Sequence, residues 1–66
     1  MNIVVNGTDQ ELPPGTTVEG VLALLESPRT GVAVAVNGDV VPRSRWPETP
    51  LASGDRVEVL APAQGG

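Results

Sequence analysis

The sequence predicts a small α+β domain with the element order ββαββ, followed by a projecting C-terminal tail. Three observations predict it: two Asn-Gly pairs that each interrupt extended runs, an apolar stretch with helical spacing between those pairs, and a final strand-like run that leads into Gly65-Gly66. The 66 residues suffice for one domain with a modest core. We expect the domain to occupy residues 1–60 and a flexible tail to occupy residues 61–66.

An N-terminal β-hairpin is the first predicted element. Met1, Ile3 and Val5 recur at every second position, and the chain resumes an extended pattern over residues 8–12 after Asn6-Gly7. Asn-Gly between two such runs is the strongest short hairpin signal, because both turn residues must accept positive φ.

A short helix is predicted next, over residues 17–26. Thr16 and Glu19 have the spacing of a capping box, which marks a helix start. The apolar residues then follow at i, i+3, i+4 and i+7 and so share one helix face: Val18, Val21, Leu22 and Leu25. Gly20 weakens the helix by about 1 kcal/mol relative to Ala. Ser27-Pro28 should end it, since the residue before proline is pushed out of the α region.

The second half of the chain predicts the remaining strands. Residues 32–36 are apolar at every position, which indicates a central strand covered on both faces. Asn37-Gly38 turns this strand into a short return strand, which Pro42 confines to an edge. We expect residues 43–50 to be irregular, with Trp46 covering one edge of the core. Alternating Val57 and Val59 predict the closing strand. This order of elements is that of the ubiquitin-like β-grasp domains.

Composition excludes several classes of partner and cofactor. The net charge is −4, which disfavours binding to nucleic acid or to an anionic membrane. No apolar run approaches the roughly 20 residues that span a bilayer, and the N-terminus lacks a signal-peptide pattern. Cysteine is absent, so disulfides and thiolate metal sites cannot form. We therefore expect a cytoplasmic protein that binds no metal and no cofactor of its own.

Reactive side chains are also absent. The chain has no His, Cys or Lys, so no Ser or Thr has an obvious base to activate it. The eight acidic residues are scattered, and no glycine pattern of a phosphate-binding loop opens the helix. A stand-alone enzyme is therefore not predicted. What remains is the terminal Gly65-Gly66, which can enter a narrow partner channel because neither residue carries a Cβ.

The chain resembles the ThiS-type sulfur carriers of thiamine biosynthesis. The likeness runs through four segments: MNIVVNG at the start, VAVAVNGDVVPRSRW in the centre, LASGDRVEV before the last strand, and the terminal QGG. The resemblance implies that an E1-like enzyme consumes ATP to adenylate Gly66. The adenylate then becomes a thiocarboxylate, with sulfur from an enzyme that draws on cysteine, and thiazole synthase uses that sulfur.

The resemblance also assigns roles in the tail. Gly66 carries the sulfur, Gly65 provides clearance in the partner channel, and Gln64 and Ala63 form the extended part. Pro62 departs from the family pattern, in which we expect a residue with a backbone N–H at that position. This departure affects the hydrogen bonding expected of the tail and leaves the role of its end unchanged.

Two alternatives stay open at this level. The small subunit of molybdopterin synthase shares the fold and the terminal Gly-Gly, although it resembles the central segment less. A ubiquitin-like binding or conjugating module would end in an isopeptide bond at Gly66 or would use its sheet face for docking.

Overall fold

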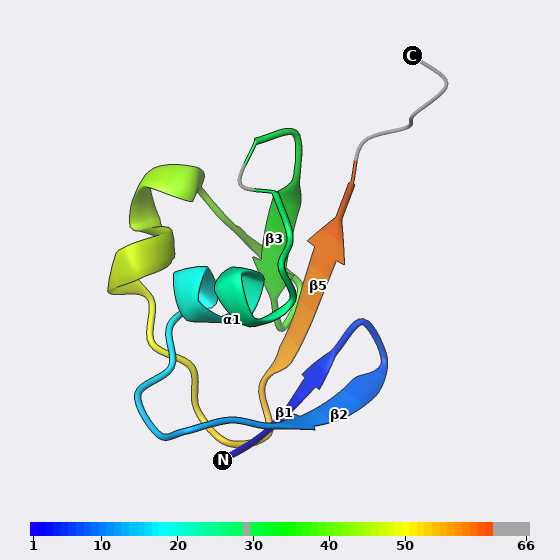
Figure 1. The fold of residues 1–66 in the computed structure, drawn as a ribbon, viewed down its shortest axis with the longest axis vertical. Coiled ribbons are helices and arrows are strands. Elements are labelled where there is room, and N and C mark those ends of the chain that lie inside the picture. Colours follow the sequence, from blue (N-terminus) through cyan, green and yellow to red (C-terminus); the bar gives the residue numbers. More distant parts are fainter. Residues whose placement is uncertain (29, 62–66) are drawn as a thin grey trace.

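The computed structural model describes residues 1–28 and 30–61. Within those ranges the chain forms a five-stranded sheet with strand order β2-β1-β5-β3-β4, and α1 packs on one face (Figure 1). The elements are β1 (Asn2–Val5), β2 (Thr8–Glu11), α1 (Val18–Leu24), β3 (Ala33–Val36), β4 (Asp39–Val41), the 3-10 helix η1 (Arg43–Glu48) and β5 (Arg56–Leu60). Strands β1 and β5 are parallel, while the other neighbours pair antiparallel. The predicted hairpin, helix, second hairpin and closing strand are all present, which gives five strands in the order ββαβββ, one strand more than ββαββ.

Both Asn-Gly pairs form the predicted turns. Asn6 and Gly7 have φ of +49° and +82°, and Asn37 and Gly38 have φ of +52° and +88°. The first turn joins β1 to β2, and the second joins β3 to β4. Positive φ at both central residues matches the twist of the flanking strands, so each turn sets the register of its hairpin.

The helix begins one residue later than the capping-box pattern predicts. Thr17 is the N-cap, and its Oγ1 accepts a hydrogen bond of 3.1 Å from the backbone N–H of Gly20. The hydroxyl of Thr16 instead donates to the carbonyl oxygen of Pro13, at 2.7 Å. Thr16 is thus used by the turn before the helix, which leaves the adjacent threonine to cap it.

The helix also ends earlier than Ser27-Pro28 predicts. The N–H of Glu26 donates to Ala23, and the N–H of Ser27 donates to Leu22, which is the pattern of a Schellman motif. Glu26 therefore takes the left-handed position that glycine usually holds, with φ of +56°. Because α1 stops at Leu24, the prediction that Leu25 lies on the buried face is wrong, and its side chain is 40% exposed.

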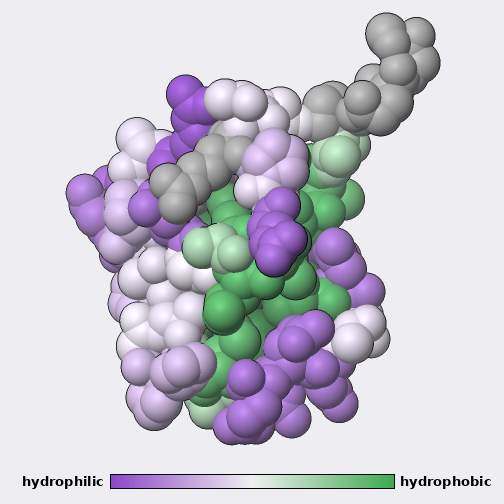
Figure 2. Space-filling view, viewed as in Figure 1, coloured by the Kyte–Doolittle hydropathy of each residue, from purple (hydrophilic) through white to green (hydrophobic). Residues whose placement is uncertain are grey.

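A single apolar core lies between α1 and the sheet. Its members are Ile3, Val5, Leu12, Val18, Val21, Leu22, Val34, Trp46, Leu51 and Val57. Full burial of one such aliphatic or aromatic side chain stabilises the fold by about 1.5–3 kcal/mol. Apolar surface also remains outside, and Figure 2 shows hydrophobic side chains gathered in a band across the middle of the molecule.

The structure corrects the position of the apolar segment 32–36. Strand β5 is the central strand, and β3 lies between β5 and β4. Val34 is buried in the core, whereas Ala33 is exposed on the opposite face of the sheet. Apolar residues at every position therefore mark an internal strand whose second face carries only small alanine side chains, not a strand covered by a layer on each face.

Residues 43–50 are more regular than predicted, since Arg43–Glu48 form η1. Trp46 of this helix is 2% exposed and belongs to the core, which goes beyond the prediction that it covers an edge. The element was missed because Trp46 is its one buried residue, so the segment has no apolar periodicity in the sequence.

Candidate functional site

The residues that the sequence predicts as functional lie in the tail. Ala63, Gln64, Gly65 and Gly66 are outside the described residues, as is Pro62. The described part of the site is the platform that leads into the tail, which consists of β5 and the surface around its end. Strand β5 ends at Leu60, and Ala61 follows it in an exposed position.

Strand β5 is held on both sides. On one side it pairs in parallel with β1, through the register Val4 to Arg56 and Val5 to Val57. On the other it pairs antiparallel with β3 as far as its last residue, where Leu60 lies opposite Ala33. Strand β5 is therefore paired on both sides at its start, and its last residues, from which the chain leaves the sheet, are paired with β3.

The face of the sheet opposite α1 is open to solvent, and its tail-proximal part is apolar. Leu60 is 58% exposed, and Val40 on the edge strand β4 is 72% exposed. Between them, β3 has Ala33 opposite Leu60 and Ala35 opposite Val40; Ala33 is exposed, whereas Ala35 is only 8% exposed. We call Leu60, Ala33, Ala35 and Val40 the apolar strip. Its small central residues leave a shallow surface flanked by two exposed aliphatic side chains, which suits contact with another protein.

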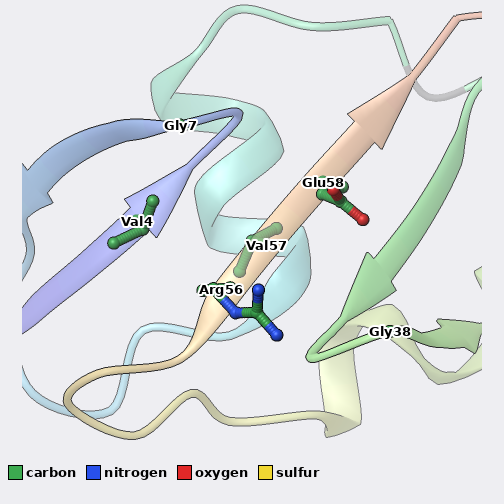
Figure 3. Close-up of a pocket in the computed structure, with 6 residues that line it drawn as sticks. All are labelled: Val4, Gly7, Gly38, Arg56, Val57 and Glu58. Carbon is green, nitrogen blue, oxygen red and sulfur yellow. The ribbon is translucent and has the colours of Figure 1, made fainter.

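Charged side chains lie on the same face beside the apolar strip, where Glu58 is directly opposite Ala35. Arg56 and Glu58 alternate with the buried Val57 and are therefore on the open side of β5. A hollow of about 350 Å³ lies beside them (Figure 3). Its lining residues are Val4, Gly7, Gly38, Arg56, Val57 and Glu58.

These groups make no catalytic arrangement. The hollow has one guanidinium and one carboxylate but no nucleophile, and the whole chain lacks His, Cys and Lys. Among the described residues, no three His, Cys, Asp or Glu side chains lie close enough together to hold a metal ion. The described helices are also too short to cross a membrane. Within the described residues, this hollow therefore offers a surface for binding, and its one carboxylate has no nucleophile beside it to activate.

Two features of this platform were not predicted from the sequence. One is the exposure of Val40, which the alternation of β4 could have indicated, since Val41 is packed against the core and its neighbour must face away. The other is the hydrogen bonding of the two turn asparagines to β5, for which the sequence contains no signal. Arg43 and Arg45 lie in η1, and Arg45 lines a second hollow of about 430 Å³ together with Val40.

The chain matches known proteins over its whole length. The sequence model of the ThiS family matches residues 3–66. The sulfur carrier protein ThiS of Escherichia coli is 30% identical over 66 residues, which cover all of both chains. A thiazole synthase of Paramagnetospirillum magneticum is 33% identical over 66 residues, and there the chain spans only 20% of the relative's length.

Solved structures agree with the fold. The crystal structure of the thiamine biosynthesis protein ThiS from Geobacter metallireducens has a TM-score of 0.84 and 32% identity, with both chains fully covered. The solution structure of a thiamine biosynthesis protein from the same organism has a TM-score of 0.82 and 32% identity, covering all of this chain and 88% of the other. The predicted β-grasp fold is thereby confirmed.

Proposed function

The chain belongs to the ThiS family of sulfur carriers in thiamine biosynthesis, and from that premise we propose that Gly66 is the residue that carries the sulfur. A ThiS protein is a small carrier and not a catalyst, which accords with a chain that has no His, Cys or Lys. The carboxylate of Gly66 is then the working group, and the rest of the domain presents it to partner enzymes.

The observation that carries this proposal is the course of β5. This strand is the centre of the sheet and remains paired with β3 as far as Leu60, so the chain leaves the sheet from a restrained point. Six further residues bring the chain to Gly66, a reach of at most about 20 Å when extended. A partner's active site can therefore lie well inside its surface while the domain stays outside. The missing Cβ atoms of Gly65 and Gly66 would let the chain enter a narrow channel.

The chemistry at Gly66 requires activation, because a carboxylate is a poor electrophile. We propose that a carboxylate oxygen attacks the α-phosphorus of ATP in an E1-like enzyme, so that pyrophosphate leaves and an acyl adenylate forms. Sulfur at the oxidation level of sulfide, supplied by an enzyme that draws on cysteine, then attacks the acyl carbon. AMP leaves with the electron pair of the broken C–O bond, and the product is a thiocarboxylate. All groups that catalyse these steps belong to the partners.

The apolar strip is the proposed docking surface for these partners. It lies on the open face beside the end of β5, so a protein bound there would have its active site within reach of the tail. Thiazole synthase is one proposed partner, supported by the thiazole synthase relative that contains a segment similar to this chain. The adenylating enzyme is the other, and the shared surface implies that the two bind in turn. These exchanges take place in the cytoplasm on this proposal.

Intact-mass analysis of the protein isolated from its native host tests the function. We expect a fraction in which one oxygen is replaced by sulfur, and fragmentation should locate the change at Gly66. Adducts linked only to lysines of other proteins would instead identify a conjugating module. Retention by a molybdopterin-synthase large subunit, and not by thiazole synthase, would overturn the pathway.

A further inference from the structure

Both turn asparagines bind the central strand through their side chains. The Oδ1 atom of Asn6 accepts a hydrogen bond of 2.8 Å from the N–H of Val59, and the Oδ1 atom of Asn37 accepts one of 3.0 Å from the N–H of Arg56. The two turns lie on opposite sides of β5, where Figure 3 marks them by Gly7 and Gly38. Each asparagine therefore does more than adopt the positive φ of its turn, since its side chain also accepts a hydrogen bond from a backbone N–H of β5.

The side-chain bond from Asn6 extends the parallel hydrogen-bond ladder between β1 and β5 beyond its last backbone bond. The N–H of Val4 donates to Asp55 at 3.0 Å, and the N–H of Asn6 donates to Val57 at 2.9 Å. In a parallel pair the next bond would run from the N–H of Val59 to the main-chain carbonyl of Asn6. At Asn6 the chain turns instead, and its side-chain oxygen takes the place of that carbonyl.

The bond between Asn6 and Val59 lies near the end of β5 that leads into the tail. The regular pairing of β1 with β5 ends at Val57, while β5 continues to Leu60. Within the described residues, the bond to Asn6 is the last hydrogen bond that joins β5 to the β1–β2 hairpin. Without it, the tail-proximal end of β5 would be restrained from the β3 side alone.

We propose that Asn6 is a positioning residue for sulfur loading, which holds the end of β5 in the orientation that delivers the tail to the adenylating enzyme. This inference rests on the proposed function. Loss of this hydrogen bond lets the end of β5 adopt other orientations. The apparent affinity of the carrier for the adenylating enzyme then falls in proportion to the fraction of carrier molecules that can dock. Once the tail is docked, the chemistry occurs in the partner and proceeds at an unchanged rate.

Asn37 provides a matched control within the same protein. It has the same turn geometry and the same type of bond, but it binds Arg56 at the start of β5, the end remote from the tail. Its Nδ2 also donates to Asp55 at 3.0 Å, so its replacement removes at least as many hydrogen bonds. A residue that merely supports the fold would therefore have at least as large an effect at position 37 as at position 6.

Three variants test the inference: Asn6→Gly, Asn6→Asp and Asn37→Gly. Glycine keeps the positive φ and removes the acceptor, whereas aspartate keeps an acceptor oxygen and tolerates the same backbone. Pyrophosphate release by the adenylating enzyme is measured as a function of carrier concentration, well below the unfolding temperature of each variant. Hydrogen exchange of the Val59 amide is followed in parallel.

For Asn6→Gly we expect KM for the carrier to rise about three- to tenfold with kcat unchanged, as loss of one hydrogen bond predicts. The Val59 amide should exchange faster by a similar factor. Asn6→Asp should keep KM and the exchange rate of the Val59 amide near those of the unaltered protein. Asn37→Gly should leave KM unchanged even where it lowers the unfolding temperature. An unchanged KM for Asn6→Gly, or an equal rise for Asn37→Gly, would overturn the inference and leave the proposed function intact. Absence of pyrophosphate release with the unaltered protein would overturn both.

Discussion

The indole Nε1 of Trp46 donates a hydrogen bond of 2.9 Å to the carbonyl oxygen of Val41. The bond joins η1 to the last residue of the edge strand β4, and it satisfies the only polar atom of a side chain that is 2% exposed. The single aromatic residue of the chain thereby fills the core and fixes the connection that crosses from β4 toward β5.

Trp46→Phe should lower the free energy of unfolding by about 1–3 kcal/mol. The replacement leaves the Val41 carbonyl without this donor and leaves unfilled volume beside the smaller ring. Urea denaturation followed by far-ultraviolet circular dichroism measures the change, since the variant has no tryptophan fluorescence. Sulfur loading per folded molecule should stay as in the unaltered protein, because Trp46 lies in the core and not on the open face. An unchanged denaturation midpoint would contradict the role of this bond.

Glu26→Gly should raise the free energy of unfolding by up to about 1 kcal/mol. Glu26 holds φ of +56° at the end of α1, and a non-glycine residue in that region costs about 1–2 kcal/mol, from which the greater freedom of unfolded glycine subtracts part. Thermal unfolding measures the gain. Glu26→Ala is the matched control, since it removes the carboxylate but keeps the Cβ. Equal stabilisation by both variants would show that the charge, and not the backbone, was responsible.

Deletion of Gly66, or Gly66→Val, should abolish ATP-dependent sulfur loading and leave thermal unfolding nearly unchanged. Among the described residues the buried core extends from Ile3 to Val57, and we expect the end of the tail to add little to it. A branched side chain at position 66 would crowd the carbonyl under attack. Loading is measured by intact mass after incubation with the partner enzymes. Persistence of loading in either variant would exclude the Gly66 carboxylate as the working group.

Val34→Ala should affect stability and not loading, the reverse of what we expect for the Gly66 variants. Val34 is buried in β3, and its truncation should lower the free energy of unfolding by about 1–3 kcal/mol through lost burial and a residual cavity. The folded fraction should still be loaded, because the open face and the tail are unaltered. Denaturation and loading, measured on the same preparation, separate a defect of the fold from a defect of the working group.

Val40→Ser and Leu60→Ser should each weaken binding to thiazole synthase and to the adenylating enzyme, by about five- to thirtyfold if these residues are anchors of the interface. Both side chains are largely exposed, so stability should change little. Leu24→Ser is the control, since Leu24 is 61% exposed but belongs to α1 on the other face of the sheet. Titration calorimetry measures the binding affinity of each variant. An equal loss of affinity in all three variants would show that the apolar strip is not the interface.

Local chemistry in the sequence determined much of this protein. The two Asn-Gly turns, the apolar face of the helix from Val18 to Leu22, and the edge position of the strand before Pro42 all follow from preferences of a few adjacent residues. The lack of His, Cys and Lys followed from composition alone and made Gly66 the predicted working residue. The tail assignments at Ala63, Gln64, Gly65 and Gly66 stay predictions, because those residues lie outside the described ranges.

The tertiary structure decided what depends on contacts between distant residues. It made β5 and not residues 32–36 the central strand, because strand order is set by pairing across the whole chain. It moved the helix cap to Thr17 because Thr16 bonds to Pro13. It also distinguished two turns of identical sequence, since Asn6 bonds to Val59, 53 residues away, and Asn37 bonds to the far end of the same strand. A hydrogen bond across that separation exists only once the sheet has assembled, and for that reason no local pattern could reveal it.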